Sequence, residues 1–334
     1  MDVPTLSPSS SKPAEAPKDS PRSIPVHRWP DRLFFGLVAA LGLSVIGLAA
    51  AIVAILVYGS RYSFQAFGFS FLWGTVWSPT STPPIFGVVP FVVGTVVTSA
   101  IALLIAFPLA LGSAIFLTTN APRWLRGPAG TAVELLAAIP SVIYGLWGIY
   151  IVHPYMATTV EPALKRYLGF TGLFDGTPLG IDVFTASVVL AIMIVPTICA
   201  ISRDTLAAVP QSQKEAALSL GATDWETTRV AMIPYARSGI IGGTMLGLGR
   251  ALGETMAVTM LIGNIDKVPT SLLSQGQTIA SLIANELLNN NGPLQESAVL
   301  EAGLILLVIA LLVNVVARLL VWRVLSVGGG GAVE

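Results

Sequence analysis

Long uncharged runs of apolar residues, separated by shorter polar segments, dominate the chain. The first run, Leu33 to Tyr58, carries no charged residue over 26 positions. About 20 apolar residues are enough for a helix to cross the hydrocarbon core of a bilayer. The pattern therefore predicts an all-α, polytopic membrane protein with six spanning helices: Leu33–Tyr58, Phe91–Leu117, about Ala132–Val152, Val183–Ser202, about Ser238–Gly263 and about Ala298–Leu320.

The segments outside these runs differ in character. Residues 1–30 mix Pro, Ser, Lys and Asp without periodicity, a composition typical of a mobile tail. A membrane domain would then cover residues 31–327, followed by a flexible tail at 328–334. Phe64 to Pro90 holds Phe and Trp at close intervals, which favours a position at the outer membrane interface.

Composition agrees with a bilayer location. Hydrophobic residues make up 54% of the chain and charged residues 11%, the mean hydropathy is +0.77, and soluble domains carry about 25% charged residues. The net charge is zero and no basic block occurs, so nothing indicates nucleic acid as a partner. With two histidines and one cysteine, no metal-ligand cluster forms at a recognisable spacing.

The distribution of Lys and Arg predicts the orientation. If the N-terminal tail is cytoplasmic, 13 of the 18 basic residues lie on the cytoplasmic side and four on the other, while Arg250 falls within a span. Positive charges gather on the cytoplasmic side of membrane proteins. We therefore expect a multi-pass protein of the plasma (inner) membrane with both termini in the cytoplasm.

A polar island at residues 204–237 separates two of the predicted spans. Ser212 stands three residues before Glu215, the spacing of a helix capping box, and Gly221 offers an easy left-handed stop. Thr223 and Glu226 repeat the capping-box spacing, and Pro234 interrupts the second helix before the next span. The pattern predicts two short cytoplasmic helices with a bend at Gly221, which form either a well-capped loop or a surface for another protein.

Three short motifs within this island resemble a known element. Glu215-Ala216-Ala217, Gly221-Ala222 and Ile233-Pro234 stand at the spacing of the EAA loop in permease subunits of binding-protein-dependent ABC importers. The resemblance implies a type I ABC importer permease fold and a short helix that docks in a groove of a cytoplasmic ATPase. Glu215 would anchor the loop, Gly221 would permit its bend, and Trp225 would belong to the coupling surface.

Other segments narrow the resemblance to permeases of the phosphate-specific importer, over about residues 30–325. They are Gly87–Phe91, Ala138–Gly148 with Pro140, Ser141, Tyr144 and Gly145, and Gly249–Ala257. The N-terminal tail and the first outer region resemble the PstC type more than the PstA type. The implied partners are a PstA-type permease in a heterodimer, a PstB-type ATPase dimer and a PstS-type phosphate-binding protein.

The chain itself is predicted not to be an enzyme. It holds no phosphate-binding G-x-x-x-x-G-K-[ST] loop, so ATP and Mg would be used by the partner ATPase and no cofactor would be bound here.

The sequence leaves alternatives open for the substrate, the second subunit and the class of transporter. The substrate is phosphate or another oxyanion such as molybdate or sulfate, the second permease is a PstA-type chain or a second copy, and an ion-gradient-driven carrier stands as a less favoured class.

Arg250 is the leading candidate for contact with the anion. A charge near the middle of a span costs about 2.5 to 3.5 kcal/mol on insertion scales, so Arg250 should face a partner or water. Glu254 follows at i+4 and could share its helix face as an ion pair. One interpretation is that Arg250 and Glu254 form an ion pair with a purely structural role. The resemblance favours a substrate pathway in which phosphate competes with Glu254 for the guanidinium.

Glycines and prolines complete the pattern of the spans. Gly243, Gly247, Gly249 and Gly253 give two successive GxxxG spacings, which predict close packing between helices. Pro140 and Pro196 are predicted to kink their spans.

Overall fold

The computed structural model describes residues 28–287 and 292–328, and within them the regular structure is helical, which confirms the all-α prediction. The β-structure among these residues consists of two isolated bridges, Ser78 with Ile85 and Gly263 with Gly276. The predicted tails lie outside the described residues, except that residues 28–30 and 328 belong to the terminal helices. The longer α-helices are α1 (Arg28–Gly59), α4 (Val89–Ile115), α5 (Arg123–Ala137), α9 (Val183–Ala207), α12 (Ile233–Leu252) and α15 (Pro293–Gly328).

Shorter helices connect the long ones. The α-helical pieces are α2 (Arg61–Phe67), α3 (Ser70–Trp73), α6 (Ser141–Trp147), α7 (His153–Tyr155), α8 (Glu161–Leu168), α10 (Gln211–Ser219), α11 (Asp224–Thr227), α13 (Met256–Leu261) and α14 (Ile279–Glu286). π-Helical turns occupy Phe116–Asn120, Gly148–Val152, Met156–Val160 and Thr228–Met232, and a 3₁₀ turn occupies Gly169–Thr171.

The chain forms two compact units, residues 1–52 and 53–334. The described part of the first unit is α1 up to Ile52, an apolar helix whose side chains from Leu33 onward are exposed. All further elements belong to the second unit.

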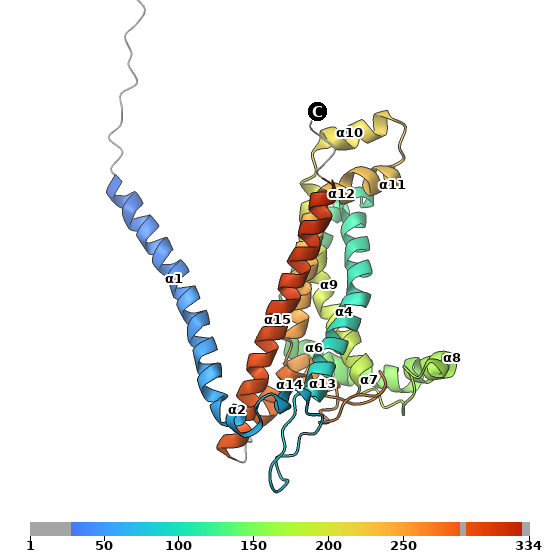
Figure 1. Ribbon diagram of the computed structural model, residues 1–334. Coiled ribbons are helices and arrows are strands. Elements are labelled where there is room, and N and C mark those ends of the chain that lie inside the picture. Colours follow the sequence, from blue (N-terminus) through green and yellow to red (C-terminus); the bar gives the residue numbers. More distant parts are fainter. Residues whose placement is uncertain (1–27, 288–291, 329–334) are drawn as a thin grey trace, which may run out of the picture. The chain divides into compact units, whose positions relative to one another are not determined.

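Within the second unit, α9 packs against α4, α5 and α12, and α15 runs along α12 (Figure 1). Alanines on α4 recur every four residues on one helix face, and their small side chains allow close approach of the neighbouring helix. All four are fully buried in the core shared with α9: Ala102, Ala106, Ala110 and Ala114. Gly243 and Gly247 of α12 face Ile201 and Ile198 of α9, which confirms close packing at the first predicted GxxxG pair.

A second core lies at the opposite end of the bundle from α10 (Figure 1). The Trp77 ring lies 4.7 Å from Phe86 and 5.1 Å from Phe91, centroid to centroid, and these rings are buried. The chain folds back at the Ser78–Ile85 bridge and buries the Trp77 and Phe86 rings, so the position of Phe64–Pro90 at the outer interface stays a prediction. Phe69 and Trp73 remain exposed.

Two predicted spans are interrupted rather than straight. Four helices among the described residues are long and apolar enough to cross a membrane: Leu33–Gly59, Val89–Asn120, Val183–Ala207 and Pro293–Val316. The third predicted span is a pair of helical segments, Arg123–Ala137 and Ser141–Thr171, bent by 91°, and counting it gives five. The fifth predicted span breaks between α12 and α13. Pro140 explains the first break, since the residue before proline disfavours helical geometry. Pro196 lies inside the continuous α9.

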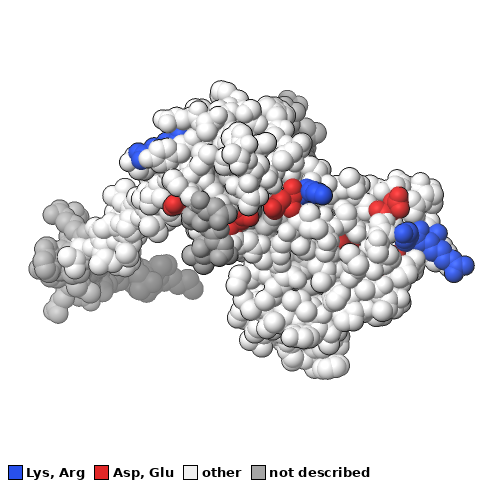
Figure 2. Space-filling view, turned by 90° about the horizontal axis from the view of Figure 1, so that it is seen from below, with Lys and Arg blue, Asp and Glu red and all other residues white. Residues whose placement is uncertain are grey.

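Charged side chains are sparse on the surface, as expected for a chain with 11% charged residues. Seen from the α2 end, the surface of the molecule shows few charged side chains, in small scattered groups (Figure 2).

Candidate functional site

The break between α5 and α6 exposes backbone carbonyls that the rest of the fold then satisfies. Pro140 precedes α6 in an extended conformation and ends the α5 ladder of hydrogen bonds. The Tyr144 hydroxyl donates to the Leu136 carbonyl oxygen at 2.9 Å. Nη1 of Arg250 donates to the Ala137 carbonyl oxygen at 3.3 Å. A cation at the carbonyl end of a helix is favoured by the helix dipole.

The second break follows Arg250 directly. α12 ends at Leu252, and the Glu254 carboxylate accepts a hydrogen bond from the Ala257 backbone N–H (3.2 Å), at the start of α13. Glu254 is buried. The predicted Arg250–Glu254 ion pair is wrong in this structure: in the part of the chain described, the carboxylates within 4 Å of a guanidinium are Glu134 and Asp204, both beside Arg203. The i+4 relationship requires a continuous helix, and the break at Gly253 removes it.

The two breaks pack against each other. An added Cβ at Gly145 would lie 2.5 Å from Met260 Sδ and 3.2 Å from the Ala257 backbone of α13. Tyr144 and Gly145 are buried, whereas Ser141, the first residue of α6, is half-buried. Two of the three segments that carry the resemblance, Ala138–Gly148 and Gly249–Ala257, therefore form one site.

The Arg250 guanidinium remains partly open. Nη1 also donates to Thr197 Oγ1 of α9 at 3.2 Å. Across the described residues, no hydrogen bond reaches Nη2 or Nε, and Arg250 is only half-buried. Arg250 can thus present a two-nitrogen edge, the geometry that suits a carboxylate or phosphate. Sequence reasoning did not identify Thr197 or the Ala137 carbonyl, because no local spacing relates them to Arg250.

The polar island forms a second candidate site at the other end of the bundle (Figure 1). Gly221 has φ +85°, which confirms its left-handed conformation. Ala222 N–H donates to the Ala217 carbonyl oxygen and Gly221 N–H to that of Leu218, the paired bonds of a glycine-terminated helix.

The second helix of the island is capped as predicted. Thr223 and Glu226 form the capping box. The Thr223 backbone N–H donates to Glu226 Oε2, and this bond lowers the pKa of the Glu226 carboxyl.

Two details of the island differ from the prediction. Ser212 does not cap the first helix: α10 begins at Gln211, after Pro210, and no side chain caps it. Pro210 occupies the N-cap position, and its side chain has no acceptor that could cap the helix. Pro234 does not separate the second helix from the next span. The chain stays helical from Asp224 to Leu252, because the π-helical turn Thr228–Met232 precedes the proline and absorbs its missing N–H.

The island exposes apolar side chains where a soluble loop would present polar ones. Leu220 is 90% exposed and Trp225 62%, and Leu218 and Val230 are also exposed. Glu215 and Ala216 are exposed, and Ala217 and Ala222 are half-buried. An exposed apolar cluster rimmed by polar residues is typical of a protein-binding surface.

An ion pair that sequence reasoning missed lies beside this island. Arg203 Nη2 lies 2.8 Å from Glu134 Oε1 and 2.9 Å from Asp204 Oδ1, and so joins α9 to α5. Gly130 makes room for it, because an added Cβ there would lie 2.3 Å from Arg203 Nη1. The sequence did contain a signal for this ion pair, because Glu134 and Arg203 lie at the ends of two predicted spans on the same side of the membrane.

The fold is one found in ABC transporters. The crystal structure of a bacterial alginate ABC transporter, in complex with alginate pentasaccharide-bound periplasmic protein, holds a chain with TM-score 0.59 and 18% identity, over 89% of this chain and 97% of that one. An inward-facing structure of the MetNI methionine ABC transporter gives 0.52 and 17%, over 71% and 95%. At 17–18% identity the likeness shows the fold alone, a helical fold shared with chains of ABC transporters.

Sequence comparison identifies the family. The family model "Binding-protein-dependent transport system inner membrane component" matches residues 106–326. The phosphate transport system permease protein PstC of Pasteurella multocida is 48% identical over 302 residues, 89% of this chain and 93% of that protein. The PstC of Mesorhizobium japonicum is 46% identical over 311 residues, 91% and 94%. The chain belongs to the inner membrane components of binding-protein-dependent transport systems, and among them to the PstC permeases.

Proposed function

We propose that the chain is the permease subunit that carries phosphate through the membrane in an ATP-driven importer. The observation that carries this proposal is the 46–48% identity, over about nine-tenths of the chain, to proteins named phosphate transport system permeases. The paired helix breaks support it, since interrupted helices form substrate sites within membranes in many transporters.

Arg250 is the proposed phosphate contact. Its Nη1 is held by the Ala137 carbonyl and by Thr197, so the guanidinium keeps a fixed orientation while its other nitrogens stay open. Glu254 acts by position rather than as a competing anion: its carboxylate supports the start of α13 through Ala257. Phosphate then meets a single oriented cation. One cation is enough to attract the anion and permits its release.

ATP hydrolysis is proposed to reach this site through the polar island. α10 and α11 would dock on a PstB-type ATPase dimer, with Trp225, Leu218 and Leu220 entering its groove and Gly221 setting the angle between the two helices. ATP and Mg belong to that partner. A PstA-type permease would complete the path, a PstS-type protein would deliver phosphate, and both termini would face the cytoplasm.

Uptake of labelled phosphate by the co-expressed complex tests the proposal. We expect uptake that requires the ATPase subunit and its ATP hydrolysis. ATPase stimulation by molybdate or sulfate in place of phosphate would redirect the substrate assignment. Uptake by this chain alone in liposomes, without an ATPase, would overturn the ABC mechanism in favour of a gradient-driven carrier.

A further inference from the structure

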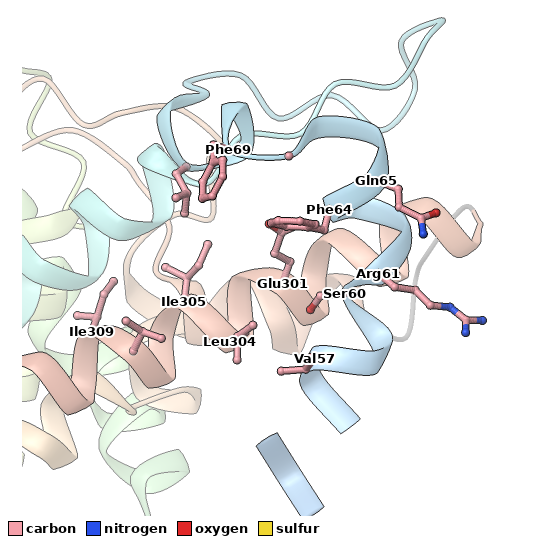
Figure 3. A pocket seen from close by; sticks show the side chains of 13 residues that line it. Val57, Ser60, Arg61, Phe64, Gln65, Phe69, Glu301, Leu304, Ile305 and Ile309 are labelled. Atoms are coloured by element: carbon pink, nitrogen blue, oxygen red, sulfur yellow. The ribbon is translucent and has the colours of Figure 1, made fainter. Parts of the chain in front are cut away.

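An apolar cavity of about 590 Å³ lies where the end of α1 turns into α2 and both face α15 (Figure 3). It is separate from the helix breaks around Arg250. Aliphatic and aromatic side chains form most of its wall, among them Val57, Phe69, Leu304, Ile305, Val308 and Ile309. Two of the lining helices, α1 and α15, are long and apolar enough to cross a membrane, so the cavity lies at the lipid-facing edge of the fold.

One acidic side chain points into this apolar cavity. Glu301 of α15 is only 6% exposed, and among the described residues its Oε2 atom has no hydrogen-bond partner, although the buried Ser63 hydroxyl, itself unpartnered, lies close to the carboxyl. Figure 3 shows Glu301 close to Ser60 and Phe64, on the inner side of the cavity. Buried polar atoms in native proteins are nearly always hydrogen-bonded, and a carboxylate can accept several bonds, so the Ser63 hydroxyl leaves room for a further donor at Glu301.

A cation stands at the rim of the same cavity. Arg61, the first residue of α2, points outward in Figure 3. Its guanidinium lies over the Tyr58 ring at 4.2 Å and donates to the Tyr62 hydroxyl at 2.8 Å. Within residues 28–287 and 292–328, no carboxylate lies within 4 Å of it. Exposed tyrosines beside an arginine at the end of a span are typical of the level of lipid headgroups.

We propose that this cavity binds a phospholipid with a primary-amine headgroup, of the phosphatidylethanolamine class. An acyl chain occupies the apolar wall along α15, the ammonium donates to Glu301 Oε2, and the phosphate meets the Arg61 guanidinium. The opposite charges of Glu301 and Arg61 favour this class of headgroup. A choline headgroup has no N–H to donate, and a glycerol headgroup brings no positive charge to Glu301. The proposal rests on the membrane location of the chain and not on phosphate transport.

Lipid binding to the purified full-length protein tests this proposal. We would titrate the protein in detergent with phosphatidylethanolamine, phosphatidylcholine or phosphatidylglycerol, and measure bound lipid by native mass spectrometry together with the midpoint of thermal unfolding. We expect phosphatidylethanolamine to bind and stabilise most. Glu301→Gln should weaken its binding about tenfold, the effect of losing one charge-assisted hydrogen bond, and Arg61→Gln should also weaken it.

Asp224→Asn is the control, because Asp224 is an exposed carboxylate on α11 that does not line the cavity. Ile305→Trp fills the cavity without touching the carboxylate and should also reduce binding, which keeps the test valid if Glu301→Gln does not fold. Equal binding of the three lipids, or unchanged binding by Glu301→Gln, would overturn the proposal. Cross-linking of Val308→Cys to a helix of a second permease subunit would also overturn it, since a helix at this place excludes lipid.

Discussion

Arg250 and Ala137, 113 positions apart in the chain, meet through a hydrogen bond of 3.3 Å from the guanidinium to the last carbonyl of α5. This bond couples the two interrupted helices, because α5 ends where Arg250 arrives and α12 ends two residues after it. The charge that is costly in a membrane is thereby directed to the negative end of a helix. The same contact orients the nitrogens that we assign to phosphate.

Substitutions at Arg250 distinguish the effect of its positive charge from the effect of its hydrogen-bonding geometry. Arg250→Lys keeps the positive charge but loses the two-nitrogen edge, and we expect kcat/KM for phosphate uptake to fall by about tenfold or more, with Arg250→Leu lower still. Thr197→Val removes one partner of Nη1 and leaves the open edge, so uptake should stay within about twofold. Wild-type uptake by Arg250→Leu would remove this residue from the pathway.

Gly145 is predicted to tolerate no side chain. In Gly145→Ala the new methyl group meets Met260 Sδ at 2.5 Å and the Ala257 backbone at 3.2 Å, and overpacking of this kind costs about 1–3 kcal/mol. The midpoint of thermal unfolding should fall. Gly112→Ala, at a helical glycine with open space around it, should be neutral or slightly stabilising. Partial recovery by a second change, Met260→Ala, would identify the clash as the cause.

Gly221 is predicted to act through backbone geometry alone. Among the described residues, no atom lies within 4 Å of an added Cβ at Gly221, but φ is +85°, and a left-handed conformation costs an L-residue about 1–2 kcal/mol. Gly221→Ala should lower co-purification of the ATPase subunit while the transmembrane bundle keeps its unfolding midpoint. Gly127→Ala, in a helix with open surroundings, is the control. Undiminished ATPase association in Gly221→Ala would show that the angle between α10 and α11 is unimportant for docking.

Glu161 and Asp182 predict a pH dependence of stability. Both side chains are fully buried, and Thr185 serves both: its N–H donates to Asp182 and its hydroxyl to Glu161. Burial raises the pKa of Asp182, just before α9, to about 7, and the neighbouring Glu161 adds to the shift. The neighbouring segments hold two basic side chains. His153 lies where an added Cβ at Gly180 would meet it, and Lys165 donates to the Gly176 carbonyl oxygen.

Because the folded protein holds this proton more tightly than the unfolded chain, the free energy of unfolding should fall as pH rises from about 4 to about 7 and level off above. Asp266, whose pKa burial raises to about 6, contributes in the same direction. The informative quantity is therefore the difference between wild type and Asp182→Asn in unfolding midpoint at each pH. An identical pH profile for the two proteins would contradict the raised pKa of Asp182.

Local patterns gave the predictions that the structure confirms. Uncharged runs located the long helices, and the capping box of Thr223 with Glu226 and the turn at Gly221 depend on bonds that span three to five residues. Such features involve neighbouring residues, so they can be inferred from spacing. The Ser212 cap failed for a local reason as well, because Pro210 starts the helix earlier.

The sequence by itself determined that this protein is an all-helical membrane subunit with an exposed polar island, because hydrophobic length and cap spacing are local quantities. Only the tertiary structure decided which atoms Arg250 binds, that Glu254 supports α13 rather than Arg250, and that Glu301 points into an apolar cavity. These relationships depend on where helices break and how they pack, and packing brings together residues whose separation along the chain carries no signal.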